Sequence, residues 1–241
     1  NYDTSYTSFR VKRGNEVKDY IFGRKYGFLG KDSSDVTLVK NSDNIVATWS
    51  VDGLTFTQTV TLANTKSALH GMASISYGVK STDGRSADSV QARVMLDTAL
   101  GYQDYAVYEL TKKDSTYEQI QSETVIDNSD GEAYNNALFG YDNPKAPSVT
   151  AYTVNASINN KIVAPYQIAF GHWNNLASSV FDFEPDNSLT FTNPYNEKYL
   201  TADSAYALYF DMGSVAANGE GNTVATNYGI YSLSLIHISE P

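Results

Sequence analysis

The sequence predicts an all-β protein, a large antiparallel β-sandwich that forms a single domain. Three observations lead to this prediction. The chain contains 19 Tyr and 10 Phe against 3 Met, and aromatic side chains favour strands because they fit a pleated, half-buried surface. Apolar and polar residues alternate with the period of two that is typical of strands in several segments. Turn-forming dipeptides separate these segments, and 241 residues is a length that such folds reach as one domain.

The segment Ser89–Tyr108 carries the clearest alternation. Its apolar positions are Val90, Ala92, Val94 and Leu96, and its intervening positions are Gln91, Arg93, Met95 and Asp97. This pattern predicts a strand with one buried face and one looser face. The alternation stops at Asp97, where we expect a loop that runs to Asp104.

A hairpin around Asp52-Gly53 determines its own register. Ile45–Val51 and Leu54–Leu62 flank this dipeptide, which supplies the two positive φ angles of a type I′ turn. The register then places Trp49 opposite Phe56 on an apolar face. Combined with the neighbouring strands, it predicts a shared core that contains Trp49, Phe56, Ile75, Tyr77, Val90, Val94 and Leu96.

The same reasoning gives roughly a dozen strands along the chain. The remaining predicted strands are Tyr6–Val11, Asp19–Phe22, His70–Val79, Val149–Ile158, Ile162–Ala169, Ser179–Phe183, Ala205–Phe210 and Val224–Ile230. From Ile45 to Leu96 the strands follow one another antiparallel, without room for a crossover helix. The one helix candidate is Ser115–Val125, which has modest helical propensity and a poor apolar stripe.

The composition excludes several classes of function. The net charge is −10 and Lys and Arg never cluster, so we expect no nucleic-acid partner. No apolar run approaches the roughly 18 residues of a membrane-spanning helix. The sequence contains no P-loop, no His-Glu-x-x-His and no Gly-x-Ser-x-Gly motif, so we expect no cofactor and no metal. The absence of Cys is ordinary for an extracellular bacterial protein.

Both ends of the chain look unnatural. It begins at Asn1 without Met or a signal peptide, and we expect that an upstream export signal was removed or was not captured. Leu233–Pro241 resembles translated sequencing adapter, although its apolar residues would also suit a last strand. We expect a β-sandwich domain over residues 1–232 and an artefactual tail over 233–241.

Two segments carry a resemblance to a known group of proteins. In Val90–Tyr108 the matching positions are Leu96, Asp97, Thr98, Gly101, Asp104, Ala106 and Tyr108. Asp203–Tyr231 matches a closing pair of strands with a Gly-containing turn. Together they resemble uncharacterised β-sandwich domains of large secreted or wall-associated proteins of Gram-positive bacteria, with a departure at Tyr105 and Val107.

This resemblance implies a sandwich of the broad type shared with galactose mutarotases and with domains of polysaccharide-degrading enzymes. It also implies an extracellular or cell-wall-associated location, and a longer parent chain with other domains. Such architectures host both catalysts and inert modules, so the fold alone does not assign an activity.

Asp97 and Asp104 are the first candidate binding residues. They bracket a Gly-containing loop at a strand end, where carboxylates can bind Ca²⁺ or orient a sugar. The alternative is structural, because Asp97 at this junction can accept hydrogen bonds from loop N–H groups, with help from Thr98. We expect Asp97 to be mostly buried in this structural role.

The second candidate is the run His172, Trp173, Asn174 and Asn175, which we expect in a loop. An aromatic ring beside amide side chains suits sugar stacking and hydrogen bonding. An aldose epimerase needs a His acid and a carboxylate base that converge on the sugar ring, and no Glu motif accompanies His172. The structural alternative is a packed aromatic side chain beside a satisfied histidine.

Two classes of function remain open. The leading hypothesis is a non-catalytic, extracellular β-sandwich module of a larger bacterial surface or secreted protein, which contacts carbohydrate. The alternative is a carbohydrate-active enzyme, either an aldose epimerase or a glycoside-cleaving sandwich. Two carboxylates roughly 5–9.5 Å apart in one groove would favour the enzyme.

Overall fold

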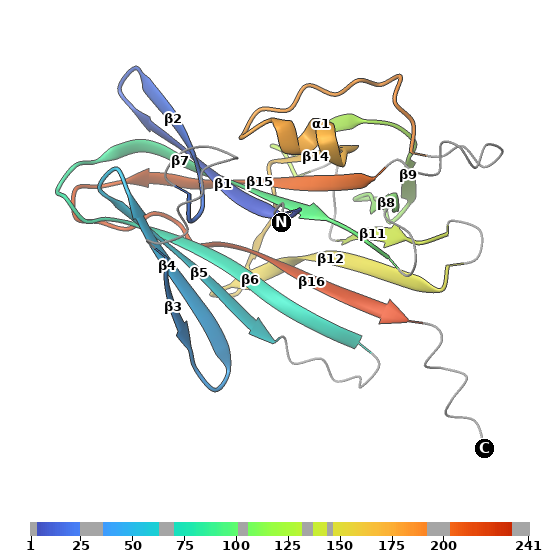
Figure 1. Cartoon of the computed structure of the whole chain (residues 1–241), viewed down its shortest axis with the longest axis horizontal. Helices are drawn as coiled ribbons and strands as arrows, with labels where there is room; N and C mark the ends of the chain where they lie inside the picture. Colours follow the sequence, from blue (N-terminus) through green and yellow to red (C-terminus); the bar gives the residue numbers. More distant parts are fainter. Residues whose placement is uncertain are drawn as a thin grey trace.

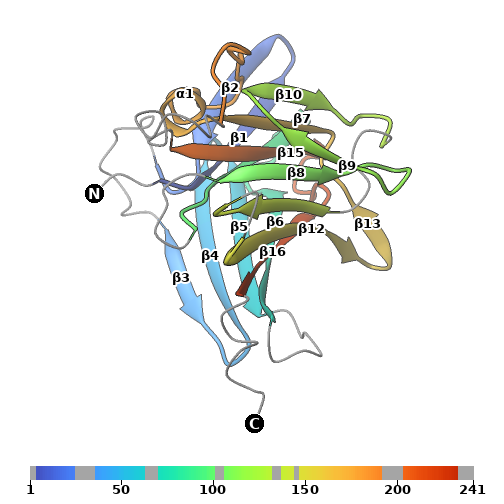
Figure 2. The same cartoon turned by 90° about the vertical axis from the view of Figure 1, so that its right-hand side faces the viewer.

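Two antiparallel sheets form the molecule, which is described by a computed structural model. The structure describes residues 4–24, 36–62, 70–100, 106–131, 137–143, 147–191 and 203–232. Figures 1 and 2 show the two sheets as layers, with the short helix α1 (Trp173–Ser178) on the side of the smaller sheet that faces away from the larger one. The predicted antiparallel β-sandwich is therefore confirmed. No helix among these residues is long and apolar enough to cross a membrane.

Within the described residues, the smaller sheet has six strands and the larger has ten. The six-stranded sheet has the order β10 (Thr124–Asp127), β14 (Gln167–His172), β15 (Ser204–Val215), β7 (Ala87–Asp97), β1 (Tyr6–Arg13) and β2 (Glu16–Ile21). The ten-stranded sheet has the order β3 (Thr37–Lys40), β4 (Asn44–Val51), β5 (Leu54–Leu62), β6 (His70–Ser81), β16 (Val224–Ser232), β12 (Val149–Ile158), β11 (Ala137–Tyr141), β8 (Val107–Thr111) and β9 (Tyr117–Ile120), with β13 (Lys161–Val163) paired to β12.

The core between the sheets contains the predicted residues. Five of them are buried there: Trp49, Phe56, Tyr77, Val90 and Val94. The other two, Ile75 and Leu96, are partly buried and pack against the same cluster. The rings of Phe9 and Phe56 stack across the two sheets with their centroids 4.0 Å apart. One core therefore joins β1 and β7 to β4, β5 and β6.

The β4–β5 hairpin has the predicted register and turn. Trp49 pairs with Phe56, and Val51 pairs with Leu54. Asp52 and Gly53 both have positive φ angles, of 50° and 72°, as a type I′ turn requires.

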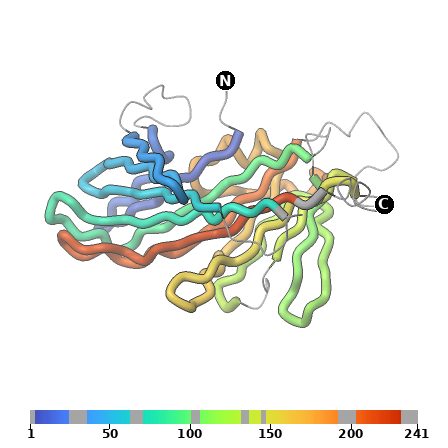
Figure 3. Tube along the Cα trace, turned by 90° about the horizontal axis from the view of Figure 1, so that it is seen from below, coloured from blue at the N-terminus to red at the C-terminus, as the bar shows by residue number. Residues whose placement is uncertain are grey.

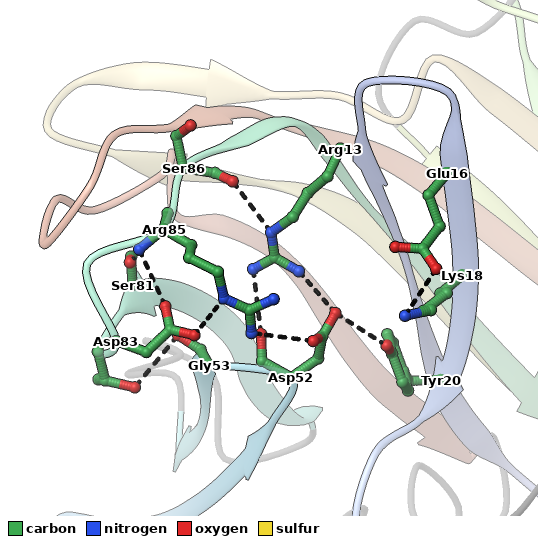
Figure 4. Close-up of polar contacts among 11 residues, drawn as sticks. Arg13, Glu16, Lys18, Tyr20, Asp52, Gly53, Ser81, Asp83, Arg85 and Ser86 are labelled. Atoms are coloured by element: carbon green, nitrogen blue, oxygen red, sulfur yellow. Dashed lines mark hydrogen bonds and ion pairs between the residues drawn. The ribbon is translucent and has the colours of Figure 1, made fainter.

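An ion-pair cluster ties this turn to the other sheet (Figure 4). Asp52 accepts hydrogen bonds from Arg13 at 2.6 Å, Arg85 at 3.0 Å and Tyr20 at 3.1 Å. Burial alone would raise the pKa of Asp52, but the hydrogen bonds from Arg85 and Tyr20 and the charge of Arg13 lower it overall. At the same end, Lys80 pairs with Glu220, so the β6–β7 and β15–β16 connections lie side by side (Figure 3).

Strand β7 differs from the prediction in two ways. It follows β6 in the chain but lies in the other sheet, so the run from Ile45 to Leu96 is not one continuous meander. Its second face is not loose either, because Arg93 and Met95 are both buried. A second apolar cluster, formed by α1 (Trp173–Ser178) and the chain after it, covers that face.

Three predicted elements are wrong or divided. Ser115–Val125 is not a helix: it contains β9 and the start of β10, and Ser115 has a positive φ of 66° in the turn before β9. Ser179–Phe183 is an irregular segment rather than a strand. Its carbonyl groups accept hydrogen bonds from side chains of the six-stranded sheet instead of from a neighbouring strand. Ile162–Ala169 is interrupted at Pro165, which separates β13 from β14.

Candidate functional site

The run from His172 to Asn175 does not form the predicted loop. His172 is the last residue of β14 and the N-cap of α1, and the other three residues form the first turn of that helix. The cap is unusual because the side chain of His172 makes no capping hydrogen bond. Another residue therefore stabilises the start of the helix.

That residue is Glu123, which immediately precedes β10 and is completely buried. Its Oε1 accepts hydrogen bonds from the backbone N–H of His172 at 2.9 Å and from the Asn175 amide at 3.0 Å. Its Oε2 accepts one from the backbone N–H of Asp186 at 2.9 Å. The carboxylate thus fixes the strand-to-helix junction, and its oxygens face protein donors.

The remaining polar groups of this corner also contact the backbone. The ring Nε2 of His172 lies 3.3 Å from the carbonyl oxygen of Thr190, and the ring meets Phe191 edge-on at 5.5 Å between centroids. The indole N–H of Trp173 donates to the carbonyl oxygen of Thr4 at 2.9 Å. His172 and Trp173 therefore hold two different chain segments, while Asn174 is exposed. These interactions correspond to the structural alternative of the sequence analysis.

Asp97 lies at the end of β7, where it pairs with Ala205, and is partly exposed. Its backbone N–H donates to the hydroxyl of Ser5 at 2.9 Å. Burial raises the pKa of the Tyr108 phenol, and the charge of Asp97 adds to this effect. Asp104 lies outside the described residues. Within the described part of the chain, no group of three or more His, Cys, Asp or Glu is placed to hold a metal.

The junction after Asp97 is held by neutral hydrogen bonds. The hydroxyl groups of Thr98 and Tyr108 lie 2.7 Å apart, and Tyr108 donates to the carbonyl oxygen of Ser204 at 3.0 Å. Thr98, Tyr108 and Ser204 are all buried. The distinctive residues of Val90–Tyr108 therefore include a network that fixes the end of β7 against β8 and β15.

A cavity of about 250 Å³ between the two sheets is the better candidate for a binding site. It lies where β1 and β7 of the six-stranded sheet face β5 and β6 of the ten-stranded sheet. Its lining consists of Ser5, Tyr6, Thr7, Ile21, Phe22, Arg24, Gln58, Ile75, Tyr77, Val94, Met95 and Leu96. Aliphatic and aromatic side chains form most of this lining, with a small set of polar groups among them.

Three of the polar groups form a connected set around the Tyr77 hydroxyl. The Thr7 hydroxyl lies 2.6 Å from it, and the amide of Gln58 donates to it at 2.8 Å. Burial raises the pKa of Tyr77, although its hydrogen bonds with Thr7 and Gln58 oppose this effect. The phenol is therefore neutral at pH 7. Hydroxyl and amide groups in an apolar enclosure can orient a neutral polar ligand by hydrogen bonding.

The cavity was not among the sites predicted above, but the sequence does contain a signal for it. The inward positions of β5 are Leu54, Phe56, Gln58 and Val60, so Gln58 interrupts an apolar series at a core-facing position. Thr7 similarly occupies the face of β1 that carries Phe9 and Val11. A polar residue on a core face needs a buried partner, and the two residues meet at Tyr77.

Neither a family model nor a curated protein matches this chain. Among solved structures, the chain is similar to an Escherichia coli K12 protein described as a candidate aldose 1-epimerase, with 9% identity and a TM-score of 0.46 over 93% of this chain and 79% of that one. It is also similar to a galactose mutarotase-like protein from Lactobacillus casei ATCC 334, with 10% identity and a TM-score of 0.46 over 92% of this chain and 80% of that one. The likeness concerns the fold alone, and the site is assigned from the geometry described above.

Proposed function

We propose that this domain is a non-catalytic β-sandwich module of a larger bacterial surface or secreted protein, and that it binds a neutral sugar residue in the cavity between its sheets. The observation that carries the proposal is the polar set formed by Thr7, Tyr77 and Gln58 within a mostly apolar lining. The resemblance of Val90–Tyr108 and Asp203–Tyr231 to domains of secreted and wall-associated proteins supports the extracellular location.

The cavity combines the two kinds of surface that a pyranose ring presents. Sugar C–H groups pack against aliphatic and aromatic side chains, and here Ile75, Val94 and Leu96 supply such walls. Sugar hydroxyls need both donors and acceptors, which the Gln58 amide and the Tyr77 hydroxyl supply. A volume of about 250 Å³ is slightly below the roughly 300 Å³ at which pockets for drug-sized ligands begin. The enclosure therefore suits one sugar residue.

The contacts of the Glu123 carboxylate, which lies beside His172, support binding without catalysis. An epimerase needs a carboxylate and a His that both face the sugar ring. Glu123 instead contacts the backbone N–H of His172 and is fully buried. The groups assembled around Tyr77 are neutral hydroxyl and amide groups, which bind and orient a ligand.

Saturation-transfer NMR with D-glucose, D-galactose, D-mannose and N-acetyl-D-glucosamine tests the proposal. Ile75→Trp should fill the cavity, and Gln58→Leu should remove an amide donor at nearly constant volume. We expect at least one sugar to bind the wild type, and both variants to weaken its binding by tenfold or more. Val39→Trp on the exposed edge strand β3 is the matched control for the added indole.

Two results would overturn the proposal. The wild type could bind none of the four sugars, or both folded variants could bind with unchanged affinity. Circular dichroism and melting temperatures of the variants establish that they are folded. Faster anomer interconversion in the presence of the wild type would favour the epimerase alternative.

A further inference from the structure

A row of aromatic residues crosses the outer face of the ten-stranded sheet, away from the cavity. In β11, Leu138 faces the core, so Phe139 and Tyr141 point to the opposite face. Their rings are nearly parallel, with an interplanar angle of 14° and centroids 6.4 Å apart. In β12, Ala151 and Thr153 are buried and Tyr152 lies between them on the outer face.

The ring of Tyr152 lies over Gly229 of the neighbouring strand β16, which has no side chain. Tyr152 pairs with Phe139 on one side and with Gly229 on the other. A Cβ atom at Gly229 would come within 2.5 Å of the Tyr152 ring carbon Cζ and 2.6 Å of its hydroxyl. Any other residue at 229 would therefore displace the ring. Glycine at this position allows the phenol ring to lie against the backbone of β16 while remaining partly exposed.

A carboxylate lies within this aromatic row. Glu109 in β8 pairs with Phe139, and its Oε1 accepts a hydrogen bond from the Tyr141 hydroxyl at 3.1 Å. Burial raises the pKa of Tyr141, and the neighbouring Glu109 raises it further. Beyond Glu109, Tyr117 of the edge strand β9 is 63% exposed. The row thus spans β9, β8, β11 and β12, three strand spacings or roughly 14 Å.

We infer that this face, made of Glu109, Tyr117, Phe139, Tyr141 and Tyr152, binds a chain of neutral sugar residues. Flat aromatic rings pack against the C–H faces of successive pyranose rings, and a carboxylate accepts hydrogen bonds from sugar hydroxyls. The charge favours this occupant over an acidic polymer, because the chain has a net charge of −10 and the one charged group of the row is itself a carboxylate. The inference rests on the proposed function only for the class of ligand, since the cavity and the aromatic row are separate surfaces.

Affinity gel electrophoresis with soluble neutral polysaccharides tests this inference. The probes are xylan, mixed-linkage β-glucan and galactomannan, with polygalacturonate as the acidic comparison. We expect at least one neutral polymer to retard the wild type. Tyr152→Ala and Phe139→Ala should each weaken that retention by fivefold or more. Glu109→Gln, which preserves the shape of the side chain, should weaken it by a smaller factor. Val39→Ala on β3 is the matched control, and its retention should equal that of the wild type.

The outcomes separate this inference from the proposed function. Loss of retention in Tyr152→Ala and Phe139→Ala, while single sugars still bind in the cavity, supports the aromatic row as a site of its own. The inference is wrong if no neutral polymer retards the wild type. It is also wrong if the folded Tyr152→Ala and Phe139→Ala proteins are retarded as strongly as the wild type. Retention by polygalacturonate alone would also overturn it. Loss of retention in Gln58→Leu with unchanged retention in Tyr152→Ala would assign the polymer to the cavity instead.

Discussion

The guanidinium group of Arg93 donates a 2.8 Å hydrogen bond to the carbonyl oxygen of Leu176 in α1. Arg93 is completely buried, and the acceptors in contact with it are neutral. Its Nε donates to the Tyr209 hydroxyl at 3.0 Å, and its Nη1 donates to the Tyr6 hydroxyl at 3.0 Å and to the carbonyl oxygen of Ser179 at 3.1 Å. The carbonyl groups at the end of α1 have no further helical turn to donate hydrogen bonds to them. The Arg93 side chain of β7 supplies donors in its place.

Arg93→Met should destabilise the domain by about 2–4 kcal/mol, because it leaves several buried acceptors without a donor. Equilibrium urea unfolding measures this change. Lys161→Met is the matched control at an exposed position and should change stability by less than about 0.5 kcal/mol. Equal stability of the Arg93→Met and wild-type proteins would mean that the arginine does not anchor α1.

Glu123→Gln should destabilise the domain by about 1–3 kcal/mol. The amide of glutamine replaces one acceptor oxygen by a donor, and this donor would face either the N–H groups of His172 and Asn175 or the N–H of Asp186. Urea unfolding followed by tryptophan fluorescence measures the change, since Trp173 lies in the first turn of α1, which Glu123 contacts. Glu184→Gln serves as the control, because Glu184 is exposed. Equal losses in both variants would contradict the role of Glu123.

Trp49→Ala should destabilise the domain by about 3–5 kcal/mol, because it empties a large volume in the core. The Trp49 side chain is 2% exposed and packs edge-on against Tyr20 of β2 in the other sheet and against Phe22, which directly follows that strand. Leu62→Ala is the control, since Leu62 is 84% exposed. A loss under 1 kcal/mol for Trp49→Ala would contradict the assigned core.

Asp52 should make the stability of the domain depend on acid pH. The folded protein lowers the pKa of Asp52 below its usual value of 3.8. A carboxyl group whose pKa is lowered on folding stabilises the protein above the unfolded-state pKa, and this contribution is lost as the pH falls through the folded-state pKa. Melting temperatures between pH 2 and pH 7 should therefore differ most between wild type and Asp52→Asn near neutral pH, and the two should converge below pH 4. Asp43→Asn, at an exposed position, should show no such convergence.

Deletion of Leu233–Pro241 should leave the fold intact. Strand β16 ends at Ser232, where it pairs with Val149. The melting temperature of the protein that ends at Ser232 should equal that of the full chain. Unfolding of the shortened protein would show that the tail is a genuine part of the domain.

Local patterns predicted the fold well wherever a strand has one core face. The alternation along β4, β5 and β7 and the positive φ angles required at Asp52-Gly53 determined both the faces and the hairpin register. The pattern could not show that β6 and β7 lie in different sheets, because their alternation is the same in either arrangement. Nor could it show that Arg93 is buried, since the segment that covers it lies about 85 residues further along the chain.

The site was less predictable, for a related physical reason. His172 and Trp173 have the chemistry of a sugar site, but their ring nitrogens contact the backbone carbonyl oxygens of Thr190 and Thr4. No local sequence pattern indicates these contacts. Glu123 lies 49 residues from its partner His172. The polar groups of the cavity come from three strands in two sheets, and in the sequence only the inward position of Thr7 and Gln58 in an apolar series marks them.

The most direct test of the central claim is one NMR experiment that observes binding and chemistry together. Freshly dissolved α-D-glucose and α-D-galactose are mixed separately with the wild-type protein, and saturation transfer and anomer interconversion are recorded in the same sample. For at least one of the two sugars, we predict saturation transfer that Ile75→Trp abolishes, while both sugars interconvert at the rate measured in buffer. Interconversion accelerated by the wild type, or no saturation transfer to either sugar, would contradict the claim that this cavity binds sugar without catalysis.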